Sequence, residues 1–312
     1  MTDRVYILGA GAIGLALAVN LNLESREVIL VRTSRADVSK RSSIISMTNA
    51  DDELVQMQMD MVSLDKLRHL DGIVVNTAKS YANEMIANKL ARMRIESPIV
   101  VMQNGMGVER PFLDAGFAEI YRCILFSTSQ KMDELHIRYR PIAPSPIGII
   151  RGDVQTLHGI VNALNTSGFQ FSAVEDIQEK IWQKTILNSV FNSICPLLDV
   201  DNGIFHRNDE IARIALEVME ECALVASAVG VKVDINQLKQ QMLAISKAAD
   251  GQFISTLQDI RNGRETEISS LNLAIARIAD EQNPKIRIDK TRILGELTFL
   301  KSEISRVRND VK

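Results

Sequence analysis

Cysteine and histidine are both scarce in this sequence of 312 residues. The three cysteines, Cys123, Cys195 and Cys222, are widely spaced and odd in number, so they fit neither a disulfide framework nor a metal site. We expect all three to pack in the core of a protein from a reducing compartment. None of the four histidines stands at metal-ligand spacing from another histidine or a cysteine, which predicts no metal cofactor; they are His69, His136, His158 and His206.

Long apolar runs and a strong net charge are missing as well. No run is long enough to span a bilayer, and the net charge of −3 gives no indication of a nucleic-acid or anionic-membrane partner. The first residues are polar and lead directly into a short strand pattern, so we expect no signal peptide and a cytoplasmic location. Hydrophobic residues at 46% and charged residues at 24% are typical of a globular protein, and the length suits two domains.

The first half of the chain alternates short apolar runs with helical patterns. The runs are typical of buried parallel strands and occupy residues 5–8, 27–32, 72–78 and 98–105, with further strands at 121–129 and 145–152. Helices are predicted at about 13–22, 81–93 and 154–164. Repeated strand–helix–strand units predict a doubly wound, Rossmann-type α/β sheet.

The pattern changes at about Asp176. Strand signals end there, and amphipathic helical segments continue to the end of the chain. No linker rich in proline, glycine or serine marks the change. We therefore predict a dinucleotide-binding domain over residues 1–175, joined directly to an all-α substrate and catalytic domain over residues 176–312.

A glycine-rich loop follows the first predicted strand. "GAGAIG" at 9–14 places Gly9, Gly11 and Gly14 in a G-x-G-x-x-G pattern that opens a helix. The first glycine allows a tight turn, the second lets the backbone approach a pyrophosphate, and the third permits close helix–strand packing. The alternative is a glycine-rich turn without a ligand. The pattern and its position favour a dinucleotide site formed by the whole loop, including Ala10, Ala12 and Ile13.

The end of the second predicted strand indicates which dinucleotide is bound. An acid there holds the ribose hydroxyls of NAD, whereas a basic residue meets the 2′-phosphate of NADP. The sequence reads "LVRTSRADV", with no acid at the strand end and Asp37 only later. Arg32 and Arg35 are candidates for a phosphate contact, and the alternative is that both are solvated surface residues.

Three polar residues form a line on a helix that is otherwise apolar. Lys184, Asn188 and Asn192 recur every fourth residue within "WQKTILNSVFN", so they share one face. Apolar neighbours on several sides indicate a buried helix, in which a lysine and two carboxamides need partners or a function. A structural polar network would explain them; we favour a functional cleft.

A second polar cluster follows about sixty residues later. Ser255 and Asp259 are one helical turn apart, and Asn262-Gly263 ends that helix. A further helix is predicted to begin at Thr266-Glu267. Glu267 is a candidate partner for Lys184; alternatively, its carboxylate merely complements a helix N-terminus.

At this point the chain resembles the ketopantoate reductase family over essentially its whole length. The resemblance is carried by an ordered set of motifs, which is more specific than any one of them. These are "GAGAIG" at 9–14, Lys79, "QNGMG" at 103–107, "WQKTILNSVFN" at 182–192 and "STLQDIRNGRETEI" at 255–268. It implies a nicotinamide-dependent reductase and a homodimer.

The resemblance also implies a role for each matching residue. Lys184 would be the general acid that protonates the ketone oxygen, with Glu267 beside it. Asn104 would lie near both the nicotinamide and the substrate, and Lys79 near the cofactor. The substrate's carboxylate and hydroxyl would be held by Asn188, Asn192 and Ser255.

The chain departs from the family pattern at both ends of the implied site. Gln252 stands where the family has a substrate-binding asparagine, and "SSLNL" at 269–273 replaces a run that begins with aspartate. Thr33 falls where the family has its 2′-phosphate arginine. These departures favour a D-2-hydroxy acid dehydrogenase of the D-mandelate type, with NAD slightly preferred over NADP. The alternatives are 2-dehydropantoate 2-reductase with NADPH, a dinucleotide sensor without turnover, and a helical interaction scaffold.

Overall fold

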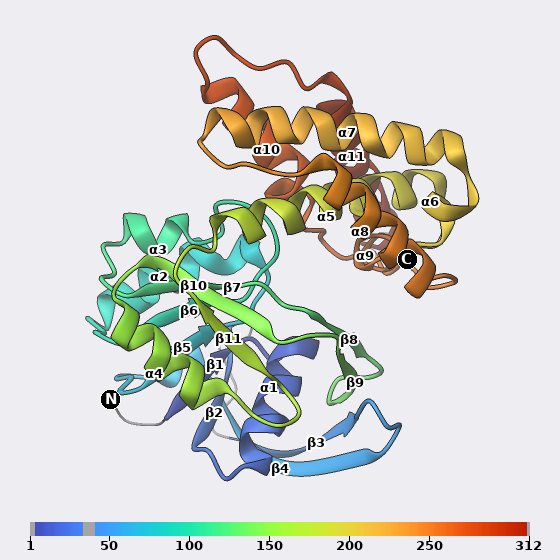
Figure 1. The fold of residues 1–312 in the computed structure, drawn as a ribbon. Coiled ribbons are helices and arrows are strands. Elements are labelled where there is room, and N and C mark those ends of the chain that lie inside the picture. The colour runs from blue at the N-terminus through green and yellow to red at the C-terminus, as the bar shows by residue number, and fades with distance from the viewer. Residues whose placement is uncertain (1–3, 34–40, 311–312) are drawn as a thin grey trace. The chain divides into compact units, whose positions relative to one another are not determined.

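The structure is a computed structural model that describes residues 4–33 and 41–310. Two compact units are present (Figure 1). Unit 1 comprises Met1–Gln103 and Val108–Ile177, and unit 2 comprises Asn104–Gly107 and Gln178–Lys312. Residues 104–107, which comprise the end of the strand predicted at 98–105 and the two residues after it, therefore group with the helical unit.

Unit 1 is built on one mixed β-sheet. A central block of parallel strands runs from β7 to β4, flanked by strands of mixed direction. The spatial order of the strands is β11 (Phe171–Val174), β10 (Ser145–Arg151), β7 (Ile120–Cys123), β6 (Ile99–Val101), β5 (Ile73–Asn76), β1 (Val5–Leu8), β2 (Val28–Arg32), β4 (Leu54–Ser63), β3 (Arg41–Thr48), β9 (His136–Pro141) and β8 (Ser127–Lys131).

Both faces of the parallel block are buried, which explains its continuous apolar strands. Val5 and Ile7 of β1 point to the face that is covered by α1 (Ala12–Leu23) and α4 (Val154–Leu164). Tyr6 and Leu8 point to the face that is covered by α2 (Asn83–Arg92) and α3 (Arg110–Asp114). Helices on both faces make the sheet doubly wound, as the sequence predicted.

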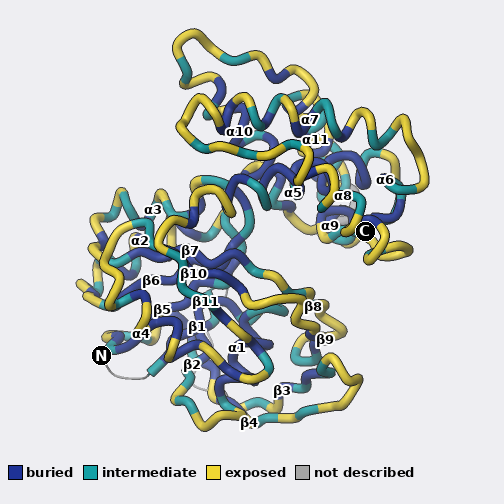
Figure 2. Tube along the Cα trace, viewed as in Figure 1, coloured by how far each residue is buried: buried dark blue, intermediate teal, exposed yellow. Residues whose placement is uncertain are grey.

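The regular secondary structure in the described part of unit 2 is all helical. Its helices are α5 (Gln178–Leu198), α6 (Ile204–Arg207), α7 (Asp209–Ala228), α8 (Ile235–Ala248), α9 (Ser255–Arg261), α10 (Asn272–Glu281) and α11 (Asp289–Asp310), with the 3-10 turn η3 (Ile268–Ser270). Helix α5 packs against α7, α9 and α11 and is buried along most of its length (Figure 2). It is the central element of this unit's core.

The predicted fold class, a Rossmann-type α/β sheet followed by an all-α region, is confirmed. One predicted helix start was wrong. The segment predicted to begin a helix at Thr266-Glu267 forms the short turn η3, and α10 begins only at Asn272. Leu271, with φ −107° and ψ −109°, lies outside helical geometry and separates the two.

All three cysteines are buried and none of them forms a disulfide bond, and burial raises the pKa of the Cys195 and Cys222 thiols to about 12. Among the described residues, no group of histidine, cysteine and acidic side chains is placed to hold a metal ion. Over the same residues, none of the helices combines the length and the apolar character that crossing a membrane requires.

Candidate functional site

The glycine loop of unit 1 is fixed by contacts among its own backbone, β2 and the end of β5. Gly9 N–H donates to Val31 O at 2.8 Å, and Gly9 O accepts from Thr77 Oγ1 at 2.9 Å. Gly9 has φ +114°, and a Cβ there would lie 2.6 Å from Ala78 N. A Cβ on Gly14 would lie 2.6 Å from Thr77 Oγ1 and well inside contact distance of Gly9 O. Both glycines are therefore required by the fold itself.

Gly11 differs from these two glycines because no described residue crowds it. Its φ of −81° is open to any residue, and a Cβ there would meet no heavy atom of the described residues within 4 Å. It caps α1, whose first N–H groups have no partner within the helix. Ala10, Ala12 and Ile13 beside it are half-buried. Open space in front of a helix N-terminus fits the pyrophosphate of a dinucleotide.

The end of β2 carries a pair that local sequence does not predict. Arg32 Nη2 lies 3.0 Å from Glu134 Oε1, from the turn between β8 and β9. Arg32 Nε is buried and has no hydrogen-bond partner among the described residues. Thr33 follows in a half-buried bend, whereas Arg35 and Asp37 lie outside the described residues. The strand end thus has an acidic neighbour, Glu134, that is distant in the sequence.

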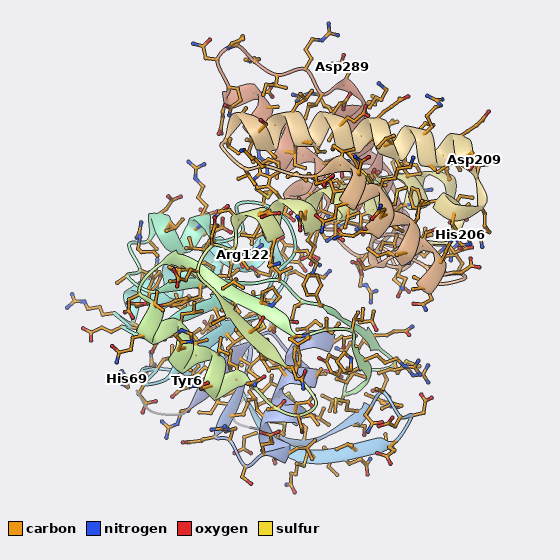
Figure 3. All side chains as sticks on the ribbon, in the orientation of Figure 1. Tyr6, His69, Arg122, His206, Asp209 and Asp289 are labelled. Atoms are coloured by element: carbon orange, nitrogen blue, oxygen red, sulfur yellow. The ribbon has the colours of Figure 1, made fainter. Side chains whose placement is uncertain are left out.

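Buried amides occupy the carboxyl ends of β5 and β6. Gln103 Nε2 donates to Ala78 O at 2.6 Å and to Asn83 Oδ1 at 2.7 Å, and Asn83 also accepts from Asn76 Nδ2 at 3.0 Å. Arg122, fully buried and labelled in Figure 3, donates to Gln103 O at 2.8 Å. The network holds the segment at which half-buried Lys79 begins η2 (Ser80–Ala82), next to the glycine loop.

The polar line predicted on 184–192 lies on α5. Its members become more buried along the helix, since Lys184 and Asn188 are half-buried and Asn192 is only 4% exposed. Asn192 Nδ2 donates to Asn188 O at 3.0 Å, and its Oδ1 accepts from Thr256 Oγ1 at 2.7 Å. The carboxamide of Asn192 is therefore held from two sides.

A small cavity of about 50 Å³ lies in unit 2 beside this line. Among its lining residues are five of the predicted site residues: Asn104, Asn188, Asn192, Ser255 and Glu267. The lining also includes Ile254, Thr256, Asp259 and Leu271. The volume has room for on the order of four water molecules or one carboxylate-sized group.

Asn104 reaches this cavity because the backbone after it lies against η3. Met106 N–H donates to Ser270 O at 2.7 Å, and Ser270 Oγ donates to Asn104 O at 3.5 Å. Gly105 has φ +95°, and a Cβ there would lie 2.6 Å from Ser270 Oγ. Only glycine allows this approach. The unusual run at 269–273 thus contains the serine that holds the segment with Asn104.

Two lining residues that the sequence analysis did not assign support the predicted ones. Thr256 fixes the amide orientation of Asn192 through its hydroxyl. Asp259 accepts from Arg264 Nε at 2.9 Å, and its carbonyl accepts from Arg264 N–H at 2.8 Å. These two hydrogen bonds between Asp259 and Arg264 close the loop that leads to Glu267. Only the position of Thr256 next to Ser255 could have indicated its role.

The remaining predicted residues differ in their placement. Lys184 lies one helical turn before Asn188 on the same face of α5 but is not part of the cavity lining. Glu267 lines the cavity and is also the N-cap residue of η3, where its side chain makes no capping hydrogen bond; its pairing with Lys184 stays a prediction. Gln252 is exposed, lies outside the lining and accepts from Asn202 N–H through its backbone oxygen at 2.9 Å.

A larger hollow of about 490 Å³ in unit 1 lies away from these residues. It is lined by residues 91, 94–97 and 115–119, which precede β6 and β7. It is therefore at the amino ends of the strands, whereas ligands of doubly wound sheets bind at the carboxyl ends. We assign it no role in the site.

Two family models match this chain. Residues 5–151 match "Ketopantoate reductase PanE/ApbA", and residues 176–288 match "Ketopantoate reductase PanE/ApbA C terminal". The 2-dehydropantoate 2-reductase of Pyrococcus horikoshii is 26% identical, with 88% of this chain and 90% of that protein covered. The protein of the same name from Archaeoglobus fulgidus is 25% identical, with 93% and 95% covered.

Solved structures share the fold. D-mandelate dehydrogenase with NADH and anilino(oxo)acetate has a TM-score of 0.84 at 18% identity, and 97% of this chain and 99% of that chain are covered. Dimeric ketopantoate reductase from Staphylococcus aureus has a TM-score of 0.82 at 18% identity, with the same coverage. At 18% identity, the similarity to these two structures shows a shared fold only.

Proposed function

Because this chain belongs to the ketopantoate reductase family, we propose that it reduces 2-dehydropantoate, with Lys184 as the proton donor. The chain is an oxidoreductase of that family with a nicotinamide cofactor. The observation that carries the proposal is the cavity of unit 2, where Asn104, Asn188, Asn192, Ser255 and Glu267 meet beside the helix of Lys184.

The substrate proposal reverses the preference drawn from the sequence alone. The departures at Gln252 and Thr33 favoured a D-2-hydroxy acid dehydrogenase. The curated relatives, which cover about nine-tenths of the chain, are instead named 2-dehydropantoate 2-reductase. Gln252 also lies outside the cavity lining, so its difference from the family pattern is weaker support for a changed substrate.

In the proposed reaction, a cationic side chain and neutral hydrogen-bond donors have separate roles. A reduced nicotinamide supplies hydride when bound. Charge then develops on the ketone oxygen, and the Lys184 ammonium stabilises and protonates it. Asn188, Asn192 and Ser255 offer neutral donors for the substrate's carboxylate and hydroxyl, at a lower desolvation cost than further cations. Thr256 keeps the Asn192 amide group turned toward the cavity.

A steady-state assay tests the substrate. We expect kcat/KM for 2-dehydropantoate to exceed that for phenylglyoxylate at least about tenfold, because pocket contacts of a few groups give that much discrimination. A branched 2-oxo acid serves as the third substrate, and each is measured with NADH and NADPH. Faster turnover of phenylglyoxylate would instead support the D-2-hydroxy acid dehydrogenase. Tight dinucleotide binding without reduction of any 2-oxo acid would support the sensor.

For the cofactor, we infer a preference for NADH from the pair at the end of β2. Thr33 cannot bind a 2′-phosphate as an arginine does, and the Glu134 carboxylate beside Arg32 repels such a phosphate. Glu134→Gln should raise kcat/KM for NADPH relative to NADH roughly threefold to fivefold, the range for one exposed charge. Asp52→Asn, which removes a carboxylate from the exposed pair with Arg140, is the matched control. An unchanged ratio in Glu134→Gln would remove Glu134 from cofactor selection.

A further inference from the structure

The loop between α8 and α9, residues 249–254, leads directly into the wall of the cavity in unit 2. Its last residue, Ile254, and the first two residues of α9, Ser255 and Thr256, line that cavity. Helices α7 and α8 each begin at a side chain that caps the helix, whereas Ile254, before α9, has no side-chain group that could do so. The position of Ser255 and Thr256 therefore depends on how the loop before them is held.

Three charged residues hold the beginning of this loop, and we call Asp201, Arg207 and Asp250 the Asp201 clamp. Arg207 Nη2 lies 2.8 Å from both carboxylate oxygens of Asp201, and Arg207 Nη1 pairs with Asp250. Asp201 Oδ1 also accepts from Gly203 N–H at 2.7 Å and from Gly251 N–H at 3.3 Å. The Arg207 guanidinium lowers the pKa of the Asp201 carboxyl, so this carboxyl is ionised at neutral pH. Asp250 and Gly251 of the loop are thus tied to the segment that follows α5.

The segment that follows α5 also contacts the second half of the loop and α9. Asn202 N–H donates to Gln252 O at 2.9 Å. The guanidinium carbon of Arg261, on α9, lies 4.2 Å from the centre of the Phe253 ring. Arg261 Nη2 lies 3.0 Å from Asp199 Oδ1, so this arginine connects the loop, α9 and the end of α5. These contacts join the carboxyl end of α5 to the beginning of α9.

Gly203 leaves the space that the Asp201 clamp occupies. Its φ of −69° and ψ of −10° are open to any residue, so the backbone conformation does not require a glycine there. A Cβ at this position would lie 2.8 Å from Arg207 Nη1 and well inside contact distance of Asp250 Oδ1. Any other residue at position 203 would therefore push the pair of Arg207 and Asp250 out of its place.

We propose that Asp201 is a positioning residue for the substrate, because the Asp201 clamp keeps the beginning of α9 at a fixed distance from α5. Asn188 and Asn192 on α5 form one wall of the cavity. Ser255 and Thr256 at the beginning of α9 form another. Groups that bind one small substrate together need a fixed separation, since a misplacement of about 1 Å can cost up to about 100-fold in rate. The proposal rests on the proposed function in taking this cavity as the substrate site.

Steady-state kinetics of Asp201→Ala test the proposal. We expect KM for 2-dehydropantoate to rise about tenfold or more and kcat to stay within about threefold of the wild type, because the Asp201 clamp acts on groups that bind substrate and not on the proton donor. KM for the nicotinamide cofactor should not change, since the glycine loop belongs to unit 1. Gly203→Ala crowds the Asp201 clamp without removing a charge and should raise KM in the same way. Asp280→Ala breaks a pair with Arg292 elsewhere in unit 2 and is the matched control.

Hydrogen exchange of the peptide 249–256 measures the loop without turnover. Its amides should exchange faster in Asp201→Ala than in the wild type and at the wild-type rate in Asp280→Ala, because only the first variant releases the loop. Unchanged exchange in Asp201→Ala, or a KM for 2-dehydropantoate within about twofold of the wild type, would overturn the proposal. A wild type that does not reduce 2-dehydropantoate would instead contradict the proposed function, and the exchange rates alone would then decide whether the Asp201 clamp holds the loop.

Discussion

Replacing Lys184 with alanine should lower kcat for 2-oxo acid reduction by roughly 10²- to 10⁴-fold, the usual contribution of a positioned acid. The variant should fold and bind dinucleotide normally. Lys184 is half-buried and lies on α5, whereas the glycine loop belongs to unit 1. Steady-state rates measure the first effect, and circular dichroism with dinucleotide titration measures the others.

Two further variants separate the proton from the charge. Lys180→Ala removes an exposed lysine one turn earlier on α5 and should leave kcat near that of the wild type. Lys184→Arg keeps the positive charge but holds its proton far too tightly to donate it, so it should recover little of the lost rate. Near-normal turnover in Lys184→Ala would be incompatible with the proposed proton donor. Full activity in Lys184→Arg would show that charge alone suffices.

Much of the fold follows from local pattern. The helix expected at 154–164 is α4, and the predicted apolar runs contain β1, β2, β5 and β6, because both faces of that block are buried, whereas β4 was not predicted. The sheet's extension through β3, β9 and β8 was not predicted in this form. It depends on pairing β3 with β9 about ninety residues away, where side-chain periodicity carries no information on the partner.

The candidate site, like the fold, could be predicted only in part from the sequence. Asn188 and Asn192 follow from helical spacing, and Ser255 and Glu267 from the family motif. The contacts that hold these four residues in place cannot be predicted from the sequence pattern. Ser270 approaches Gly105 from 165 residues further along the chain, and Glu134 reaches Arg32 across 102 residues. Such pairs arise from tertiary packing, so neither member carries a local signal of its partner.

The glycine loop provides the second large effect, since its three glycines are needed for different reasons. A Cβ at Gly11 meets no described part of the protein, whereas it would occupy the space in front of the first N–H groups of α1. Gly11→Ala should therefore keep the free energy of unfolding within about 1 kcal/mol of the wild type. The same variant should weaken dinucleotide binding about 10- to 100-fold, because each lost hydrogen bond to a charged group costs about 1.5–3 kcal/mol.

Gly14→Ala is the matched change with the opposite expected result. Its Cβ would meet Gly9 O and Thr77 Oγ1, so α1 and the glycine loop must move apart, at a cost of about 1–3 kcal/mol or more in the free energy of unfolding. Thermal unfolding and dinucleotide titration of both variants separate the effects. If Gly11→Ala bound dinucleotide as tightly as the wild type, the open space at Gly11 would not be a phosphate site, and the loop would be a turn required only by the packing of Gly9 and Gly14. If Gly11→Ala were destabilised as much as Gly14→Ala, its weaker binding would reflect the fold rather than a lost phosphate contact.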